Sequence, residues 1–347
     1  MIKIKLSKTK ISIFLISILI LAVAVAACFL VYKKIYEQNE VGTAKIYHVG
    51  ILAGLSFFDD TTTGFKSGME KLGYKEGENI VYDLEKTDFD AEAYKRILTK
   101  FINNKVDLIF VFPTEAALMA KSLAKESNIP VLFANASLEG VDLVKDLNKP
   151  GENITGVRRP DQEIVVERFN IMRTVLPEAK KMLIPYQRGY PIVAGELEKL
   201  RLAAEGTGVE FIEMPVDNGT ELETNLQKYI QMHGVDFDAV LLIAEPIATV
   251  EKNILIMSKE LERYKIPIGG VFFNTSDLNT FFGVNVDNVV AGQQASPLAD
   301  KILKGTPPGT ISVVSAKIFL QVNLKAALAL GLKIDESILS QANEVVK

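Results

Sequence analysis

VDLIFVFPTE, which spans Val106–Glu115, is the stretch that decides the fold. Its residues Leu108–Phe112 form an uninterrupted apolar run that closes at a Pro-Thr turn, which is typical of a strand buried on both faces of a parallel sheet. A helix is predicted before it over Ala91–Asn103, and a helix over Ala116–Lys125 and a strand over Ile129–Ala134 are predicted after it. This alternation indicates a doubly wound α/β sheet, in which ligands bind outside the carboxyl ends of the strands.

The same arrangement recurs later in the chain. The apolar run Phe237–Glu245 is predicted to be a buried strand, with helices over Thr220–Met232 before it and Ile247–Tyr264 after it. The next strand, Ile266–Asn274, echoes Ile129–Asn135. Two copies of one unit indicate two similar lobes whose strand ends face each other, so the ligand is expected in the cleft between them.

The remaining predicted elements follow from apolar periodicity and from turn residues at their ends. The predicted strands are Lys45–Leu52, Ile80–Leu84, Met182–Pro185, Val209–Met214 and Ile311–Val314. The predicted helices are Gly64–Leu72, Val193–Gly206, Gln293–Lys304, Phe319–Leu330 and Ile338–Val346. The elements after the second copy form no third copy, so they are expected to cross back and complete both sheets.

The composition excludes several classes of protein. A single Cys cannot form an internal disulfide, and two His supply metal sites and catalytic triads poorly, so neither a metal nor a cofactor is expected. No glycine-rich phosphate-binding motif occurs. Six of the 39 basic residues and none of the 43 acidic ones lie in the first 34 positions, so the rest has a net charge of −10. An acidic surface argues against nucleic acid as a partner.

The N-terminal region carries a membrane signal. Ile11–Tyr32 comprises 22 uncharged residues between lysines, which is long enough to span a bilayer and places the rest of the chain on the extracytoplasmic side of the cell membrane. Val25-Ala26-Ala27-Cys28 resembles a lipobox, so the segment is either a cleaved signal peptide with lipidation at Cys28 or an uncleaved transmembrane anchor. The predicted organisation is anchor 1–34, linker 35–44, lobe one 45–157 plus about 286–314, and lobe two 158–285 plus about 315–347.

The candidate ligand-binding residues lie at predicted strand ends or at the crossing between the lobes. Hydroxyl, amide and carboxylate groups would orient a small polar solute, although each is equally typical of a turn or a helix cap. The candidates are Ser56, Phe57, Asp59, Thr114, Glu115, Asn135, Ser137, Asp161, Tyr186, Glu245, Asn274 and Thr275, with Phe58, Tyr190 and Phe273 as further apolar walls.

Specific roles are predicted for some of these residues. Thr114 is expected to cap the helix that follows the decisive strand, and Glu115 or Glu245 could receive an ammonium group. Arg158 and Arg159 follow the turn-rich stretch that begins the crossing, where an arginine could pair with a carboxylate. A ligand with both charges, such as an amino acid, would suit this set.

Five segments, in chain order, carry a resemblance to a known family: GFKSGMEKLGYKEGENIVYDL (Gly64–Leu84), the turn Thr114–Ala117, PGENITGV (Pro150–Val157), ADKILKGTPPGTI (Ala299–Ile311) and NLKAALALGLKIDESILSQANEVV (Asn323–Val346). They are similar to the ABC-transporter substrate-binding protein family that includes the tryptophan- and tyrosine-binding proteins of Gram-positive bacteria. The resemblance implies a type I periplasmic-binding-protein-like fold with two lobes, three crossings and an interlobe ligand. It also implies an ABC permease and an ATPase as partners.

Three functions are compatible with these features. The favoured one is an extracytoplasmic solute-binding protein of an ABC transporter, in which ligand shifts the lobes toward a closed state. A membrane-anchored ligand-sensing ectodomain on the same fold is the alternative. An enzyme that uses Glu115, Asp161 and Glu245 as acid and base lacks a visible nucleophile–base pair or metal set, so the chain is expected not to be an enzyme.

The polar linker predicts that the part of the chain from Lys45 onward is an independent folding unit. A fragment that begins at Lys45 should express as a soluble protein with a cooperative thermal unfolding transition, measured by circular dichroism. An insoluble or unfolded fragment under several expression conditions would contradict the tether interpretation.

Overall fold

The structure is a computed structural model that describes Val25, Cys28 and residues 45–243, 245–271 and 280–347. The chain divides into two compact units, Met1–Ile46 and Tyr47–Lys347. In the first unit Cys28 is helical and exposed. None of the described helices is long and apolar enough to cross a membrane. The predicted apolar segment Ile11–Tyr32 lies, apart from Val25 and Cys28, outside the described residues.

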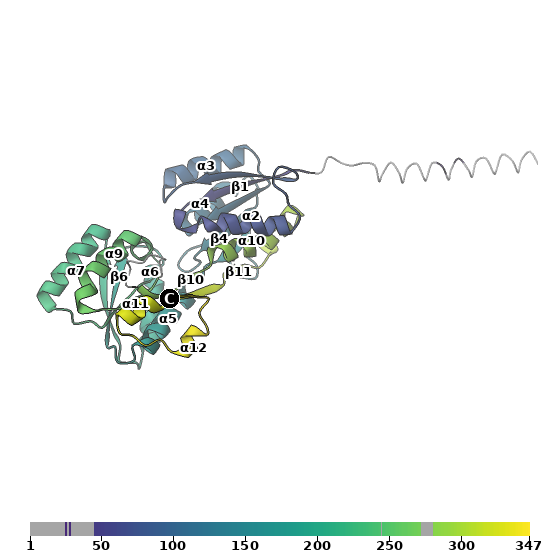
Figure 1. Ribbon diagram of the computed structural model, residues 1–347. Helices are drawn as coiled ribbons and strands as arrows, with labels where there is room; N and C mark the ends of the chain where they lie inside the picture. Colours follow the sequence, from purple (N-terminus) through teal and green to yellow (C-terminus); the bar gives the residue numbers. More distant parts are fainter. Residues whose placement is uncertain (1–24, 26–27, 29–44, 244, 272–279) are drawn as a thin grey trace, which may run out of the picture. The chain divides into compact units, whose positions relative to one another are not determined.

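The second unit contains two sheets, and each sheet with its helices is called a lobe (Figure 1). Every neighbouring pair of strands in the sheet of lobe one is parallel. Its six strands are, in spatial order, β11 (Val314–Ser315), β5 (Ile154–Arg158), β4 (Val131–Ala136), β3 (Leu108–Phe112), β1 (Tyr47–Ala53) and β2 (Ile80–Lys86).

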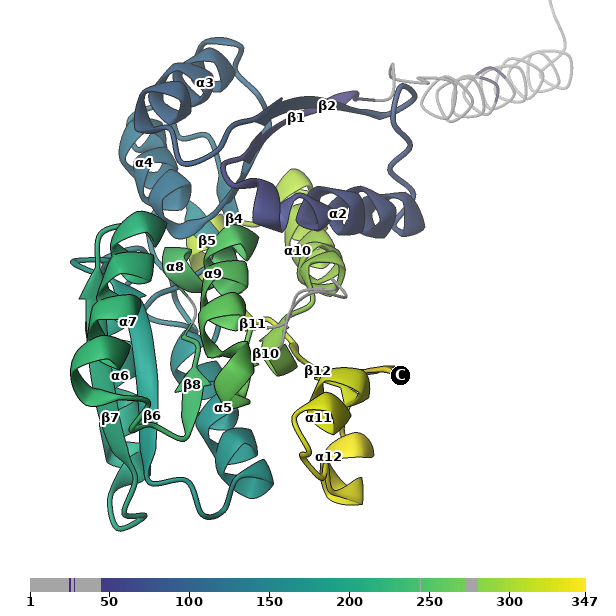
Figure 2. The ribbon, with the colours of Figure 1, turned by 60° about the vertical axis from the view of Figure 1, so that its left-hand side comes forward.

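Helices cover both faces of the lobe one sheet, as the buried strand β3 predicts. Leu108, Phe110 and Phe112 pack on one side with Phe65, whereas the alternate residues of β3 pack on the other side with Tyr94. Helices α2 and α10 lie on the first side and α3 and α4 on the second (Figure 2). The bounds of these helices are α2 Asp60–Lys71, α3 Ala91–Asn103, α4 Thr114–Ala124 and α10 Asn288–Leu303, with the short turn η1 at Ser56–Phe58.

Two glycines let α2 and α10 cross almost backbone to backbone. A Cβ atom on Gly64 would lie 1.9 Å from the carbonyl oxygen of Val289, and one on Gly292 would lie 2.1 Å from that of Thr61. Only glycine fits at such distances, so these positions fix the crossing. The contact joins segments more than 200 residues apart in the sequence and thereby holds the later segment in lobe one.

Lobe two contains seven strands, all parallel to their neighbours except for the antiparallel pair β10–β12. In spatial order they are β13 (Glu344–Val346), β12 (Ile318–Asn323), β10 (Thr280–Val286), β9 (Ile268–Gly270), β8 (Ala239–Leu241), β6 (Lys181–Gln187) and β7 (Glu210–Val216). The helices are α5 (Asp161–Val175), α6 (Val193–Ala204), α7 (Gly219–His233), α8 (Pro246–Thr249), α9 (Glu251–Leu261), α11 (Leu324–Ala329) and α12 (Glu336–Leu339), with the turns η2 (Glu262–Tyr264) and η3 (Pro308–Thr310). Helices α5 and α6 pack on one face of this sheet and α7 and α9 on the other.

The chain crosses between the lobes three times, between β5 and α5, between β10 and α10, and between β11 and β12. A backbone hydrogen bond joins the first crossing to the third: the N–H of Ala316 donates to the carbonyl oxygen of Arg158 at 2.8 Å. The predicted α/β fold with two similar lobes and a multi-crossing hinge is therefore confirmed.

Two of the predicted helices near the end of the chain are wrong. The segment Phe319–Leu330 begins as strand β12 and becomes helix α11 only after Asn323, whose side chain accepts a hydrogen bond from the N–H of Ala326 at 2.9 Å. The segment Ile338–Val346 ends in strand β13, which pairs with β12. Both segments are apolar enough for a helix, and pairing with the open edge of the sheet decides the outcome.

Candidate ligand-binding site

A cavity lies at the carboxyl ends of the strands of both sheets. It contains about 680 Å³ of space not occupied by protein atoms, including the solvent at its mouth. The loops after β1, β2, β3, β4 and β5 of lobe one and after β6 and β8 of lobe two line it. The cavity thus occupies the place that the repeated α/β unit predicts for a ligand.

Seven of the twelve predicted site residues line this cavity. They come from five different loops and include both apolar and charged side chains. They are Phe57, Thr114, Glu115, Asn135, Ser137, Asp161 and Glu245. The structure therefore brings most of the predicted set together, and their contact with a ligand stays a prediction.

Three predicted residues lie outside the cavity, and their side chains have other partners. The N–H and Oγ of Ser56 donate to Asp88 Oδ1 at 3.2 and 3.4 Å. Asp59 pairs with Lys86 at 2.7 Å, and the hydroxyl of Tyr186 donates to Glu213 Oε2 at 3.3 Å. The remaining two, Asn274 and Thr275, lie outside the described residues, as does Phe273.

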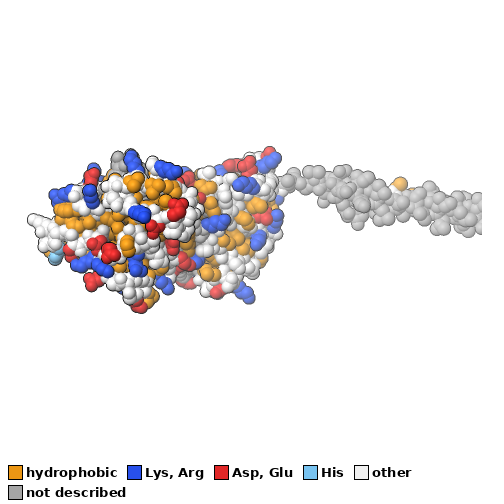
Figure 3. Space-filling model, turned by 60° about the horizontal axis from the view of Figure 1, so that its bottom comes forward, with side chains coloured by type: hydrophobic (Ala, Val, Ile, Leu, Met, Phe, Trp, Pro, Cys, Tyr) orange, Lys and Arg blue, Asp and Glu red, His pale blue; other side chains and the backbone are white. Residues whose placement is uncertain are grey.

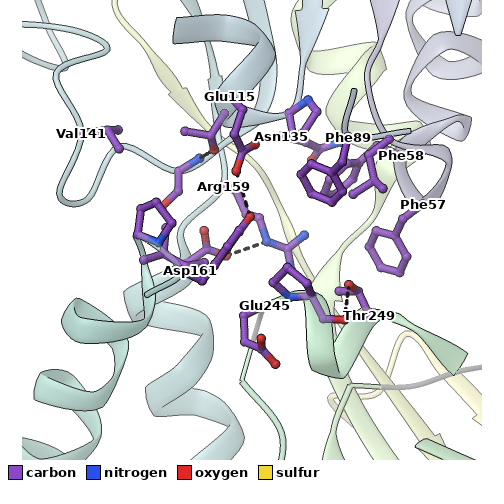
Figure 4. A pocket seen from close by; sticks show the side chains of 18 of the residues that line it. Phe57, Phe58, Phe89, Glu115, Asn135, Val141, Arg159, Asp161, Glu245 and Thr249 are labelled. Carbon is purple, nitrogen blue, oxygen red and sulfur yellow. Dashed lines mark hydrogen bonds and ion pairs between the residues drawn. The ribbon is translucent and has the colours of Figure 1, made fainter. Parts of the chain in front are cut away.

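The charged centre of the cavity is an ion pair between Arg159 and Asp161 (Figure 4). Arg159 Nε donates to Asp161 Oδ1 at 2.6 Å, and the two residues are 6% and 1% exposed. The Arg159 guanidinium also lies over the ring of Phe58, 5.9 Å from its centroid. Within the described residues, Arg159 Nη1 and Asp161 Oδ2 are buried and have no hydrogen-bond partner. The pair therefore leaves one donor and one acceptor unpaired, while the Ser137 side chain also acts on the Asp161 carboxylate and lowers its pKa.

Burial dominates the electrostatics around this pair. It raises the pKa of Asp161, and the Arg159 guanidinium offsets part of that rise. Glu196 in α6 is 1% exposed and has no hydrogen-bond partner within the described residues. Burial and then Asp161 raise the pKa of Glu196 well above its usual range, which favours the neutral carboxyl. Arg168 is also buried, with its Nε and Nη2 donating to the carbonyl oxygen of Val284 at 2.9 and 2.7 Å.

A hydrogen bond joins the two lobes across the cavity. The hydroxyl of Tyr190, in the loop after β6, donates to Glu115 Oε1 at 3.2 Å. Burial and the Glu115 carboxylate raise the pKa of Tyr190, so its hydroxyl stays protonated and remains a donor. Glu115 Oε2 is buried and has no partner within the described residues. It is a second acceptor at the cavity.

Thr114 does not cap α4, contrary to the sequence-based expectation. The N-cap position belongs to Pro113, and Thr114 is the first residue of the helix. Its hydroxyl oxygen instead accepts the backbone N–H of Ser137 at 2.9 Å, which ties α4 to the end of β4. Asn135 donates its amide to Thr61 Oγ1 at 2.7 Å, and its own Oδ1 has no partner within the described residues.

Glu245 caps a helix, and its carboxylate is already occupied. Its two oxygens accept the backbone N–H groups of Gln187, Ile247 and Ala248 at 2.8–3.0 Å. Burial nevertheless raises the pKa of Glu245 to about 7, because desolvation of a 2% exposed carboxylate outweighs these hydrogen bonds. Glu115 and Asp161, each with a free oxygen, are therefore better placed than Glu245 to receive an ammonium group.

An apolar wall completes the cavity, and part of it was not predicted. Phe57 and Phe58 pack edge to face with centroids 5.1 Å apart. Phe89, Leu118 and Val141 also line the cavity but were missed (Figure 4). The signal for Phe89 was its place just after the predicted strand Ile80–Leu84, flanked by aspartates. For Leu118 and Val141, which follow α4's first turn and β4, nothing in the local pattern distinguishes a cavity wall from core packing.

The chemistry of the cavity suits the binding of a small molecule. No group of three or more His, Cys, Asp or Glu side chains suited to a metal ion occurs in the described part of the chain. The cavity combines buried, oppositely charged groups that have one free site each with aromatic and aliphatic walls. Such a site fits a ligand that carries separate positive and negative charges on an apolar body.

Comparison with known proteins identifies the family. A family model described as "ABC transporter substrate binding protein" matches residues 49–346, so the chain belongs to this family. The chain is 26% identical over 286 residues to the tyrosine-binding protein of Clostridioides difficile (strain R20291), covering 80% of this chain and 79% of that protein.

Two solved structures support the same fold. A conserved domain protein from Vibrio cholerae has a TM-score of 0.74 at 24% identity, covering 87% of this chain and all of that one. An ABC domain from Streptococcus pneumonia in complex with L-Trp has a TM-score of 0.72 at 22% identity, covering 86% of this chain and all of that one. The type I periplasmic-binding-protein-like fold is thereby confirmed.

The family settles the class of function. The protein is a substrate-binding protein of the ABC-transporter type and binds a small molecule; it is not an enzyme. Its basic and acidic side chains are mixed over the face shown in Figure 3. The absence of a nucleic-acid partner stays a prediction from the acidic composition of the chain after residue 34.

The raised pKa of Glu245 predicts a pH-dependent stability. Its ordinary value is 4.5 and its value in the folded protein is about 7, so the folded state binds the proton more tightly than the unfolded state. Protonated Glu245 therefore stabilises the folded state by up to about 3 kcal/mol below pH 4.5. This contribution is lost as the pH rises through about 7. Denaturant unfolding of wild type and Glu245→Gln should show wild type losing stability relative to the variant between about pH 5 and about pH 8. A relative gain over that interval would mean that the three N–H donors outweigh burial.

Proposed function

We propose that this protein is an extracytoplasmic receptor that captures an aromatic amino acid between its lobes and delivers it to the permease of an ABC transporter. The observation that carries the proposal is the Arg159–Asp161 pair, with one free donor and one free acceptor, beside an aromatic wall. The free Nη1 of Arg159 would hold the ligand carboxylate. The free oxygens of Asp161 and Glu115 would hold its ammonium group.

The apolar wall supports an aromatic side chain on this ligand. Phe57, Phe58 and Phe89 line the cavity on one side of the charged pair, with the Phe58 ring next to the Arg159 guanidinium (Figure 4). Aromatic rings prefer other aromatic rings in edge-to-face or offset contacts, which add about 0.5–1.5 kcal/mol to their burial. The names of two similar proteins, one tyrosine-binding and one solved with L-Trp, agree with this ligand class.

Delivery to a permease would use the two-lobe geometry. The cavity is lined by both lobes, and Tyr190 of lobe two already contacts Glu115 of lobe one. A ligand bound by groups from both lobes stabilises the closed state by its differential affinity for that state. A permease that recognises the closed pair of lobes would then receive only loaded protein, and the transporter's ATPase would drive transfer.

The Arg159→Gln variant tests the carboxylate contact. Because the chain contains no tryptophan, binding of L-tryptophan can be followed by ligand fluorescence without protein background. Arg159→Gln should weaken L-tryptophan binding about 10- to 100-fold, the usual worth of a charge-assisted hydrogen bond. The variant should weaken binding of tryptamine, which lacks the carboxylate, less than binding of L-tryptophan, because the loss of Arg159 affects tryptamine only through Asp161.

Arg158→Gln is the matched control, because Arg158 is the adjacent arginine and pairs with Glu139 and Glu163 outside the cavity. It should bind L-tryptophan like wild type. Thermal melts of each variant separate loss of binding from loss of folding. Equal weakening of tryptophan and tryptamine by Arg159→Gln would show that Arg159 only maintains the structure, and the carboxylate assignment would fail.

We propose further that the receptor is tethered to the cell membrane by its N-terminal region, either as a lipoprotein or by a spanning segment. The support is the uncharged stretch Ile11–Tyr32 with its flanking lysines. The exposed Cys28 offers the thiol that a lipid anchor would need. Both forms place the second unit, Tyr47–Lys347, on the extracytoplasmic side.

Cys28→Ala distinguishes the two anchors. In cells grown with labelled palmitate, a lipoprotein should incorporate label that Cys28→Ala abolishes. A spanning segment should leave Cys28→Ala in the membrane fraction with Met1 still present and no label in either form. Recovery of the complete wild-type chain in the soluble fraction would contradict both forms of the tether.

A further inference from the structure

Phe89 has a backbone conformation that its side chain disfavours. Its φ is +53°, in the left-handed region. The other described non-glycine residues with positive φ are polar or long-chained, namely Lys105, Asn128, Asn135, Glu152 and Lys265. For a bulky aromatic residue this conformation is an outlier, and such outliers persist where the surroundings enforce them, often at binding sites.

Hydrogen bonds on both sides of Phe89 enforce this conformation. Its own N–H donates to the carbonyl oxygen of Gly54 at 3.0 Å, and the same oxygen accepts the Tyr94 hydroxyl at 2.6 Å. Asp88 accepts the N–H of Ser56 at 3.2 Å, and Asp90 caps α3 through the N–H of Ala93 at 3.0 Å. The backbone of the loop is therefore fixed to the end of β1 and to the start of α3.

The ring of Phe89, by contrast, is loosely held. It is 41% exposed although it lines the cavity, whereas Phe58 is 7% exposed and packs against Phe57 and the Arg159 guanidinium. Among the described residues, the ring of Phe89 has no aromatic or cation partner. A fixed backbone with a free ring allows the ring to turn by side-chain rotation alone, without movement of the lobe.

We infer that Phe89 is a specificity-determining residue whose ring covers the aromatic side chain of the bound ligand at the cavity mouth. This inference rests on the proposed function, since it needs an aromatic amino acid in the cavity. A glycine would satisfy the same backbone without strain, so the phenylalanine is explained by what its ring contacts. Phe57 and Phe58 form the fixed wall, and Phe89, the most exposed of the three, covers the ligand ring from the cavity mouth.

Two substitutions of Phe89 separate this role from a structural one. Phe89→Gly should weaken L-tryptophan binding about 10-fold or more while the melting temperature stays equal to or above that of wild type, because strain is relieved. Phe89→Leu, which keeps apolar bulk, should weaken L-tryptophan about 3- to 10-fold and leave L-leucine unchanged. All variants should bind L-alanine like wild type, because its methyl group does not reach the ring.

Lys105→Gly is the matched control, because Lys105 has φ +51° in an exposed loop away from the cavity. It should raise the melting temperature like Phe89→Gly and leave L-tryptophan affinity unchanged. If wild type and both Phe89 variants bind L-tryptophan equally well, the inference is wrong, although the proposed function still stands. If wild type binds none of L-tryptophan, L-tyrosine and L-phenylalanine, the proposed class of ligand is wrong, and this inference is wrong as well.

Discussion

The rest of the site depends on the ion pair between Arg159 and Asp161, whose atoms lie 2.6 Å apart in a nearly solvent-free position. Desolvation of a carboxylate is costly unless a paired cation and hydrogen bonds compensate for it. The pair also joins the lobes, because the N–H of Arg159 donates to Ala136 at the end of β4 while Asp161 begins α5. A charged centre built on the crossing itself keeps the same geometry relative to both lobes.

The two lobes contribute unlike surfaces around this centre. Lobe one supplies the phenylalanines after β1 and β2, and the glutamate at the start of α4. Lobe two supplies Tyr190, whose protonated hydroxyl reaches that glutamate, and the capped turn at Glu245. Because Glu245 is used internally by three N–H groups, the acceptors available to a ligand come from Asp161 and Glu115. Polar recognition therefore concentrates beside the crossing and apolar recognition toward the mouth.

The sequence predicted the fold well because its main signals are local. The apolar run Leu108–Phe112 and its copy in the second half specify buried parallel strands whatever lies around them. The helix Ala91–Asn103 was predicted with its observed bounds, since Asp90 marks its start. The last strands, β12 and β13, were missed because their state depends on pairing with a distant sheet edge, which no local pattern encodes.

The site residues were predicted from their positions at strand ends and not from the contacts of their side chains. Strand-end residues such as Asp161 and Asn135 were found because parallel strands end at one edge. Residues at the same edge, such as Ser56 and Tyr186, have partners elsewhere that sequence cannot reveal.

The three crossings also govern the order in which the lobes can be completed during synthesis of the chain. Helix α10 and strand β11 belong to lobe one but follow most of lobe two, so lobe one is complete only at about Ser315, and lobe two, which needs β12 and β13, only at about Val346. A nascent chain of this design can therefore complete neither sheet until almost its whole length has been synthesised.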